Sequence, residues 1–433
     1  MASVVQRQLI NRTFARLWAG QAVSTVGDYV FDTTLVLWMA TVLAGGQSWA
    51  PAAVSGIMLS VGAATLVVGP FAGVFVDRWN RRGTMLHTEV IRAFLAGALT
   101  VLSFLPTHVL PTWLWLAAIY VVVFALNSAG QFFTPARIAI IADVVEGTTD
   151  RARAAGITQA TTATAAIIGP PLAAPLLFTV GIQWALLLNT LSYVASYLAI
   201  RSVRTPDRPS VPQASATGLR AEFVAGLRFF AGNRFLIAIL TIAVIANVGT
   251  GALNSLDVFF VTRNLHAPAK LYGLMSTANG AGAIIGGLGA AWVVGKLTAR
   301  RTTWLALVVA GLLVVGYSRM THFPAALVVM FLILIPVSMI NTASTPLLLA
   351  NTPPEYLGRT IAVFNPVNQA SSMLSVVIGG WLASTVLHGL HATVLGVHFG
   401  TIDTIFLGTG LLIVAAGCYA TIALPPEPVP ASA

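Results

Sequence analysis

The stretch "GVFVDRWNRRG", residues 73–83, places one aspartate and three arginines between two long apolar runs. These runs, at approximately 52–76 and 84–105, are each long enough to cross the hydrocarbon of a bilayer, which takes about 20 apolar residues. The charged residues are confined to the short connection between them. The stretch therefore predicts a tight polar turn that joins two membrane-spanning helices.

Composition extends this prediction to the whole chain. The 433 residues are 57% hydrophobic and 8% charged, with a mean hydropathy of +0.85, whereas a soluble domain carries about 25% charged residues. Because so few polar residues cannot cover a water-exposed surface, we expect an all-α membrane protein. Runs of about 20 apolar residues predict twelve transmembrane helices, at approximately 14–43, 52–76, 84–105, 111–133, 154–178, 182–201, 235–260, 271–294, 303–320, 324–350, 359–388 and 399–424.

The placement of Lys and Arg predicts the orientation, because cytoplasmic loops carry an excess of these residues. With the N-terminus inside, 19 of the 23 basic residues, Arg137 among them, fall in inner loops or at inner helix ends, three fall outside, and Arg92 lies within a span. Both termini are therefore expected to be cytoplasmic, in a plasma membrane, and the arginine-rich usage favours a bacterial inner membrane. This distribution explains the net charge of +10, so no nucleic-acid partner is predicted.

The longest inner connection divides the chain into two halves. Residues 202–232 begin with a stretch rich in Pro, Ser and Arg, which is typical of a flexible linker. From Leu219 to Phe230, arginines alternate with apolar residues at helical spacing, which fits an amphipathic helix on the inner leaflet or a solvated linker helix. The predicted organisation is a six-helix bundle at 1–201, this cytoplasmic linker, and a second six-helix bundle at 233–433.

Short sequence echoes indicate that the two bundles are repeats of one another. Three pairs of segments occur in the same order in both halves: "NRTF" (11–14) with "NRFL" (233–236), "NSA" (127–129) with "NTA" (341–343), and "IIGPPLA" (167–173) with "VIGGWLA" (377–383). The offsets are 222, 214 and 210 residues. Such internal repeats are typical of secondary transporters, whose substrate site lies near the bilayer midplane between the repeats.

The charged turn quoted first resembles the loop signature of the major facilitator superfamily, G-x-x-x-D-R-x-G-R-R. Five positions match that pattern: Gly73, Asp77, Arg78, Arg81 and Arg82. Asn80 stands where the family usually carries Gly, and Asn tolerates a left-handed backbone better than most residues. The resemblance implies twelve helices in two pseudo-symmetric bundles, with the five matching residues acting as a conformational latch. The alternative is that the arginines only set the topology.

Two further resemblances point to particular branches of this superfamily. Gly169 and Pro170 match the start of the G-P-x-x-G-G element of proton-driven antiporters, while Ala173 and Ala174 replace its paired glycines. The segments "NRTFARLWAGQAVSTVGD" (11–28) and "FFTPARIAIIADVV" (132–145) are similar to macrolide-efflux and enterobactin-exporter-like facilitators. The resemblance covers nearly the whole chain and implies drug:proton antiport.

Two carboxylates, Asp28 and Asp32, lie inside the first apolar span in "GDYVFDTT" (27–34). One carboxylate at the bilayer centre costs about 2.5–3.5 kcal/mol, so such residues usually face a cavity or a partner. Gln21 and Thr25 share their helical face, and the resemblance implies that the first, fourth, seventh and tenth spans line the central cavity. We therefore predict that Asp28 and Asp32 couple protons or bind a cation, with Gln21 and Thr25 in the cavity. The alternative for Asp28 is a structural hydrogen bond to a neighbouring helix.

The remaining embedded polar residues are of two kinds. Side chains in the other cavity-lining spans are candidate substrate contacts, although each alone can also join helices: Asn127, Gln131, Asn247, Asn254, Asp257 and Asn341. Glu89 and Arg92, at i and i+3 in the third span, are expected to pair with each other or with a neighbour. No metal site is predicted at His388, His391 and His398, because no Cys or convincing acidic set accompanies them. No cofactor is predicted, and no P-loop is found.

Together these patterns predict a secondary active transporter that exports a small amphipathic molecule, such as a drug, an antibiotic or a siderophore-like compound, in exchange for protons. Its partners would be this small molecule, protons and the lipid bilayer, and a monomer is expected. Two alternatives stay open: a metabolite importer or facilitator of the same fold, and a non-transporting membrane sensor or assembly partner. No reaction chemistry is visible in the sequence, so an enzyme is not predicted.

Overall fold

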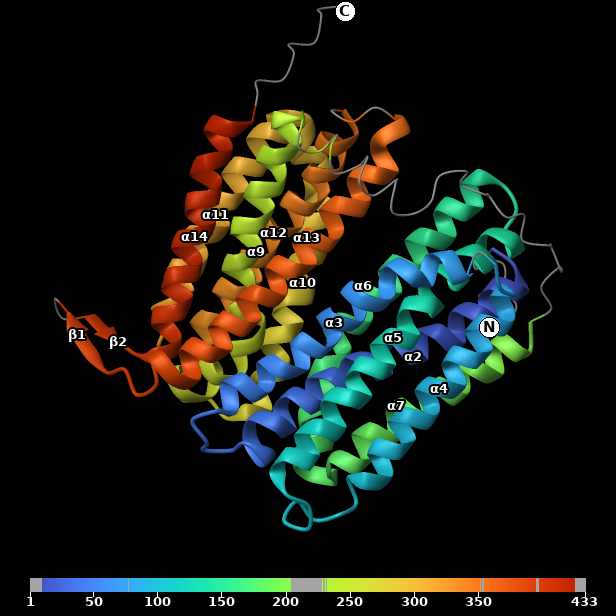
Figure 1. The fold of residues 1–433 in the computed structure, drawn as a ribbon, viewed down its shortest axis with the longest axis horizontal. Coiled ribbons are helices and arrows are strands. Elements are labelled where there is room, and N and C mark those ends of the chain that lie inside the picture. The colour runs from blue at the N-terminus through green and yellow to red at the C-terminus, as the bar shows by residue number, and fades with distance from the viewer. Residues whose placement is uncertain are drawn as a thin grey trace, which may run out of the picture. The chain divides into compact units, whose positions relative to one another are not determined.

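A computed structural model describes residues 10–76, 78–203, 228, 230, 232–350, 352, 354–394 and 397–424. Over these residues the chain is almost entirely α-helical (Figure 1), which confirms the prediction of an all-α protein. The chain divides into two compact units. Unit 1 comprises Met1–Gly46, Gly56–Gln213 and Ala269–Thr277, and unit 2 comprises Gln47–Ser55, Ala214–Pro268 and Ala278–Ala433.

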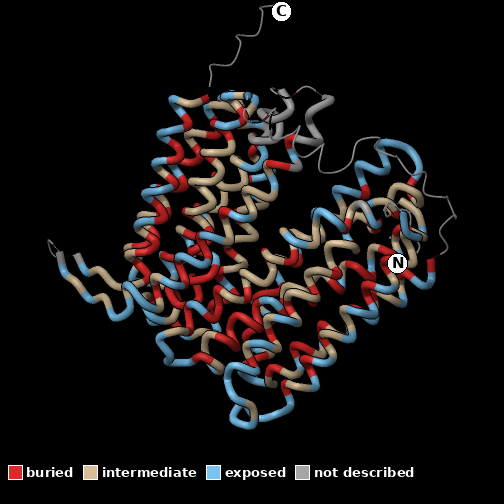
Figure 2. Tube along the Cα trace, in the orientation of Figure 1, coloured by how far each residue is buried: buried red, intermediate tan, exposed pale blue. Residues whose placement is uncertain are grey.

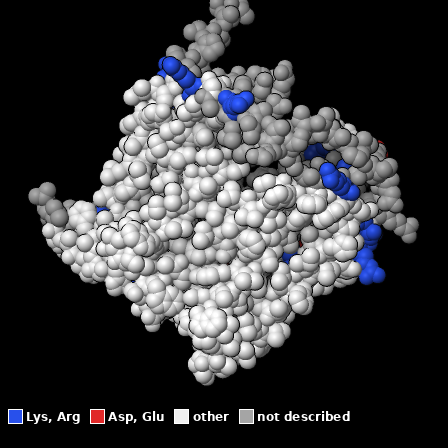
Figure 3. All heavy atoms as spheres, viewed as in Figure 1, with Lys and Arg blue, Asp and Glu red and all other residues white. Residues whose placement is uncertain are grey.

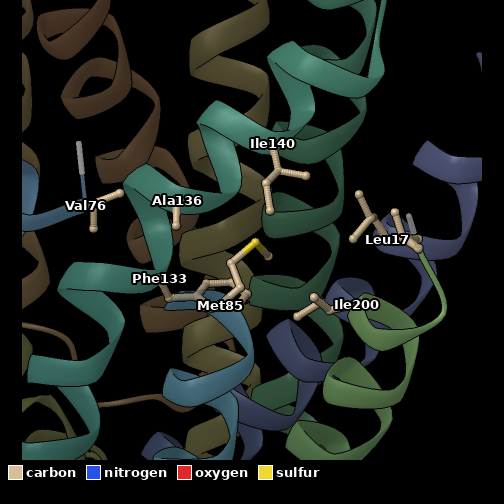
Figure 4. Close-up of a cluster of buried hydrophobic side chains, with 8 residues drawn as sticks. Leu17, Val76, Met85, Phe133, Ala136, Ile140 and Ile200 are labelled. Carbon is tan, nitrogen blue, oxygen red and sulfur yellow. The ribbon is translucent and has the colours of Figure 1, made fainter. Parts of the chain in front are cut away.

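The first half of the chain supplies six long helices. They are α2 (Arg12–Trp38), α3 (Ala50–Val76), α4 (Arg81–Leu102), α5 (Thr112–Val144), α6 (Thr148–Pro175) and α7 (Ile182–Arg201). In unit 1, α2 packs against α6 and α7, and α4 packs against α5 and α7. Leu17, Met85 and Phe133 bring α2, α4 and α5 together in a buried apolar cluster (Figure 4). This packing holds the helices that carry the charged residues of the candidate site.

The second half supplies six more long helices. They are α9 (Arg234–Phe259), α10 (Tyr272–Leu297), α11 (Ala299–Ser318), α12 (Phe323–Ala350), α13 (Pro354–Trp381) and α14 (Thr401–Ala423), with a short 3₁₀ turn η4 (Ala269–Leu271) before α10. In unit 2, α9 packs against α13 and α14, and α11 packs against α12 and α14. Strands β1 (Ala392–Val394) and β2 (Val397–Phe399) form an antiparallel hairpin, with Ala392 opposite Phe399.

The two halves repeat the same local features at their helix starts. The side chain of Asn11 accepts a hydrogen bond from the N–H of Phe14 at 2.8 Å at the start of α2. The side chain of Asn233 accepts hydrogen bonds from the N–H groups of Phe235 and Leu236 at the start of α9. The "NRTF" and "NRFL" segments thus supply the N-caps of corresponding helices.

Corresponding helices also end alike. Four helices pass into five-residue π-helical turns, two in each half of the chain: η1 (Met39–Leu43) after α2, η2 (Leu176–Val180) after α6, η3 (Phe260–Asn264) after α9, and η5 (Leu382–Val386) after α13. Gly169 on α6 and Gly379 on α13 let these helices approach the first helix of their half. A Cβ at Gly169 would lie 2.6 Å from the Cβ of Tyr29, and one at Gly379 would lie 2.7 Å from the Cβ of Ala252.

The outer surface suits a bilayer. Among the described residues, nine helices are long and apolar enough to cross a membrane; α7, α10 and α13 are not among them. Buried residues alternate along the helices with exposed ones (Figure 2), and many exposed residues are large and apolar, including Phe94 at 74% and Leu288 at 79% exposure. The face drawn in Figure 3 carries few charged side chains. A water-soluble protein would not expose so much apolar surface.

Two local features differ from the sequence predictions. Helix α5 continues to Val144 instead of ending near residue 133, so Arg137 lies within this helix, seven residues before its end. Pro135 is accommodated inside this helix, and membrane helices tolerate such prolines. The hairpin β1–β2 occupies part of a connection expected to be a loop. Asp77 and nearly all of the connection at 202–232 lie outside the described residues.

Candidate functional site

Asp28 lies at the centre of a polar cluster formed by α2, α4 and α7. Its Oδ2 accepts a hydrogen bond from Arg92 Nη2 at 2.9 Å, and its Oδ1 accepts one from the Tyr193 hydroxyl at 2.5 Å. The Arg92 guanidinium carbon lies 4.3 Å from the centroid of the Tyr193 ring. A cation therefore compensates this carboxylate and a hydroxyl orients it, which lowers the cost of an ionised group inside the membrane.

Glu89 supplies a second carboxylate to the same cluster. Its side chain is fully buried, and its Oε1 accepts a hydrogen bond from the Ser196 hydroxyl at 2.7 Å. Its Oε2 lies 4.0 Å from Arg92 Nη1 and has no hydrogen-bond partner among the described residues. Arg92 thus binds Asp28 more closely than Glu89, its neighbour on α4. Arg92 was predicted to pair with Glu89 or with a neighbouring residue. Its contact with Asp28 on α2 is shorter than its contact with Glu89.

A cavity of about 220 Å³ lies beside this cluster in unit 1. Helices α2, α4, α5 and α7 line it with Asp28, Phe31, Asp32, Arg92, Leu126, Asn127, Gly130, Gln131, Thr134 and Tyr193. Asp32 is exposed there and forms no ion pair or hydrogen bond with any residue that the structure describes. Small-molecule sites usually measure about 300–1,000 Å³, so this smaller cavity suits a proton, a small cation or one polar group.

Two amides predicted to face a cavity lie in this same wall. Asn127 donates a hydrogen bond from Nδ2 to the carbonyl oxygen of Val123 at 2.9 Å. Gln131 donates from Nε2 to the Thr65 hydroxyl at 3.3 Å. Both side chains are positioned by bonds to protein groups and border the space in front of Asp32.

The polar face of α2 is divided between two places. Gln21 and Thr25 do not line the cavity that contains Asp28 and Asp32; they line a much narrower space together with Arg137. The Thr25 hydroxyl donates to the carbonyl oxygen of Gln21 at 2.8 Å, and Gln21 Nε2 is buried without a partner among the described residues. The structure therefore groups Asp32 with Asp28, and Gln21 with Arg137.

The amides predicted in the second half lie at a different cavity. Asn247 and Asn341 line a space of about 560 Å³ inside unit 2, whereas Asn254 is absent from its described lining. Asn365 and Asn368 of α13 also line it, and neither was among the predicted residues. Their spacing in "NPVN" (365–368), one turn apart in an apolar span, is the signal that could have identified them.

The arginines of the charged turn bind partners within unit 1. Arg81 Nη1 forms an ion pair with Asp143 Oδ2 at 2.7 Å, and Arg82 Nη2 donates to the carbonyl oxygen of Arg201 at 2.8 Å. These contacts connect the start of α4 to the ends of α5 and α7. The role of these residues as a conformational latch stays a prediction.

The other described motif residues are not part of the cavity linings given above. Gly73 lies in α3 with no atom within 4 Å of a Cβ built on it, Arg78 is exposed, and Asp77 is not described. Gly169 and Pro170 are buried in α6, where the glycine permits close packing on α2. No group of three or more His, Cys, Asp or Glu side chains able to hold a metal ion occurs in the described part of the chain.

Comparison with known proteins relates the chain to a protein family. A model of the Major Facilitator Superfamily matches residues 17–376. The chain is 21% identical over 375 residues to macrolide efflux protein A of Streptococcus pyogenes, covering 86% of this chain and 90% of that protein. It is 29% identical over 222 residues to BacE of Bacillus subtilis, described as a putative bacilysin exporter, covering 50% of this chain and 51% of that protein.

Solved transporter structures share the fold at low sequence identity. The nucleoside transporter NupG matches with a TM-score of 0.73 and 12% identity, covering 96% of this chain and 100% of that chain. The peptide transporter POT, solved as a point mutant, matches with a TM-score of 0.71 and 13% identity, covering 95% of this chain and 93% of that chain. At these identities the likeness concerns the fold alone.

Proposed function

The chain belongs to the Major Facilitator Superfamily, and on that premise we propose that it is a proton-coupled exporter of a small amphipathic molecule. As a member of this family it is a multi-pass membrane transporter of small molecules and not an enzyme. Export is supported by the names of two relatives, an efflux protein and an exporter. The proposal includes a monomer in a bacterial inner membrane with both termini in the cytoplasm.

The observation that carries the proton coupling is the contrast between Asp28 and Asp32. Asp28 is held by Arg92 and Tyr193, so its charge is compensated in place. Asp32, one helical turn away, faces the 220 Å³ cavity without a partner among the described residues. Asp32 is therefore the group free to take up and release a proton. Its ionisation changes the repulsion with Asp28 and the net charge of the cavity.

The charges of the cluster link the protonation of Asp32 to the conformation of the protein. Arg92 lies between Asp28 and the partly unsatisfied Glu89. When Asp32 is ionised, three carboxylates lie around Arg92, and Arg137 also interacts electrostatically with Asp28 and Glu89. When Asp32 is protonated, the local negative charge is lower by one. In a transporter that alternates between two access states, such a change favours the state in which the group is better compensated.

Transport in inverted membrane vesicles tests this proposal. A proton gradient is followed with a pH-sensitive dye while uncharged, cationic and zwitterionic amphipathic compounds are added in turn. A transported compound is expected to dissipate the gradient with the wild-type protein. Asp32→Asn is expected to abolish this proton flux while downhill movement of the compound persists, and Asp150→Asn, an exposed aspartate at the start of α6, serves as the matched control.

Other results would contradict the proposal in distinct ways. Unchanged proton dependence in Asp32→Asn would overturn the coupling role of this residue, and normal coupled transport in Asp28→Asn would overturn a role for Asp28. Uptake only in right-side-out vesicles would favour the importer. Failure of every compound to move, with or without a gradient, would favour the non-transporting alternative.

A further inference from the structure

The cavity in unit 2 has the dimensions of a small-molecule site. Its volume of about 560 Å³ falls within the usual range of about 300–1,000 Å³ for such sites. It lies midway along α9, α11, α12 and α13, with α14 contributing Ile413. Ala, Leu, Val, Ile and Phe side chains form most of its wall, and Thr250 and four asparagines provide the polar groups.

The described lining of the cavity carries no charge. None of the seventeen described residues that line the cavity is Asp, Glu, Lys, Arg or His. A charged ligand group would lose its hydration here without gaining a counter-charge, and burial of an unpaired charge is strongly unfavourable. The cavity therefore discriminates against ions, in contrast to the Asp28–Arg92 cavity of unit 1.

Two of the asparagines form a fixed pair. Asn247 on α9 donates from Nδ2 to Asn368 Oδ1 at 2.7 Å and to its own helix at the Ala243 carbonyl oxygen at 2.9 Å. Asn368 on α13 donates from Nδ2 to the Phe364 carbonyl oxygen at 3.0 Å. These backbone bonds set the orientation of both amides, so the pair is organised before any ligand arrives.

The pair leaves one acceptor and one donor unused. An amide nitrogen has two N–H groups and an amide oxygen two lone pairs. Both N–H groups of Asn247 are occupied, whereas its Oδ1 accepts no hydrogen bond from any described residue and is not sealed off by protein atoms. Asn368 has used one of its two N–H groups. The free oxygen and the free N–H match the donor and acceptor of an amide.

We propose that this cavity binds an uncharged molecule with an apolar body and an amide or similar donor–acceptor group, anchored by Asn247 and Asn368. The proposal deepens the proposed transport function by naming the class of its cargo, and it rests on that function. The apolar wall holds the body of the molecule, and the asparagine pair selects its polar group. A pair that served only to join α9 to α13 would not need an open acceptor on a cavity of this volume.

Binding of three matched probes to the purified full-length protein in lipid nanodiscs tests the proposal. Naphthylacetamide is uncharged, naphthylacetate is anionic and naphthylmethylammonium is cationic, and all three share one apolar body. Equilibrium dialysis with empty nanodiscs as the blank corrects for partition into lipid. The wild-type protein is expected to bind the amide at least about tenfold more tightly than either ion.

Variants of residues in and next to the cavity wall test whether the amide probe binds in this cavity. Asn368→Leu is expected to weaken binding of naphthylacetamide by about tenfold, because it removes one ligand contact and the bond that positions Asn247. The control is Gln369→Leu, which removes an amide from the adjacent position of α13, outside the cavity wall. Ala246→Phe fills the cavity while keeping both asparagines and is expected to abolish binding. Asn368→Asp is expected to invert the preference toward the ammonium probe.

Distinct outcomes separate this inference from the proposed function. Equal binding of all three probes, or amide binding that Asn368→Leu and Ala246→Phe leave unchanged, would overturn the inference, even if proton-coupled transport is demonstrated. Selective amide binding that these two variants remove would support it. Because dialysis uses no proton gradient, loss of coupling in vesicles would refute the proposed function without changing this binding result.

Discussion

Asp28 in unit 1 and Asp257 in unit 2 invite comparison, because each lies on the first helix of its half and each is bound by a tyrosine hydroxyl. Tyr193 donates to Asp28 at 2.5 Å, and Tyr317 donates to Asp257 at 2.6 Å. Only Asp28 also has an arginine, since no Lys or Arg of the described residues forms an ion pair with Asp257. The two cavities also differ in charge and size. The cavity of unit 1 is small and has charged residues in its wall, whereas the cavity of unit 2 is larger and its described lining is uncharged.

This difference distinguishes the helical framework that both halves share from the side chains that determine the chemistry of each cavity. The caps, the π-helical turns and the close glycine contacts occur in both halves, so the repeat supplies a common framework. The charged cluster and the asparagine pair each occur in one unit only, among the residues that the structure describes. Charge compensation and recognition of an uncharged group require opposite environments, and two cavities allow each environment to be built without compromising the other.

The largest expected effect distinguishes the arginines of the two units. Arg92→Met removes the cation that lies closest to Asp28 and to the buried Glu89, and loss of one partner of a buried pair costs about 3–5 kcal/mol. Arg319→Met breaks the pair with Asp403 at 3.1 Å, where the arginine is 26% and the aspartate 9% exposed. It is expected to cost less than Arg92→Met, because it removes the cation from one carboxylate and not from two. Thermal unfolding of both purified variants measures this, and equal losses would remove the distinction between the units.

A smaller effect tests whether the halves are structurally equivalent. Gly169→Ala and Gly379→Ala each place a Cβ within 2.7 Å of a neighbouring helix, and overpacking of this kind costs about 1–3 kcal/mol. Both variants are expected to lower the unfolding temperature to a similar extent. Gly156→Ala on α6 is the control, because nothing lies within 4 Å of its Cβ, and it should be neutral or slightly stabilising. A large loss at Gly169 alone would break the equivalence.

The smallest effect sharpens the comparison between the two aspartates. Tyr317→Phe removes the hydrogen bond to Asp257, which has no cation to replace it among the described residues, and is expected to cost about 2 kcal/mol. Tyr193→Phe leaves Asp28 bound to Arg92 and is expected to cost about 1 kcal/mol. Chemical or thermal unfolding ranks the two variants. A larger loss for Tyr193→Phe would contradict this ranking, even though that variant also removes the acceptor of the hydrogen bond from Asn189 Nδ2 at 3.3 Å.

Features that depend on local pattern could be predicted from the sequence. The length of the apolar runs predicts the helices, and for α7 the predicted and observed limits coincide at 182 and 201. The predicted end of the fourth span near residue 133 was wrong, because α5 continues to Val144 through Pro135 and Arg137. The criterion of about 20 apolar residues limits a predicted span to the thickness of the hydrocarbon, and a helix can extend beyond that length.

Features that depend on packing between helices could not be predicted in the same way. The polar face of α2 identified Asp28 and Asp32, but nothing in α2 indicates that Tyr193, 165 residues away, binds Asp28. Asn247 was a candidate, yet its partner Asn368 lies 121 residues later on α13. Helical periodicity shows which side of a helix is polar and does not say which side chain of another helix meets it.

The π-helical turns after α2, α6, α9 and α13 change the direction in which the chain leaves these helices. A turn of this kind holds one more residue than an α-helical turn, and one residue corresponds to about 100° of rotation around the helix axis. The turns occur in two corresponding pairs of helices. The chain therefore leaves the corresponding helices of both halves with the same added rotation.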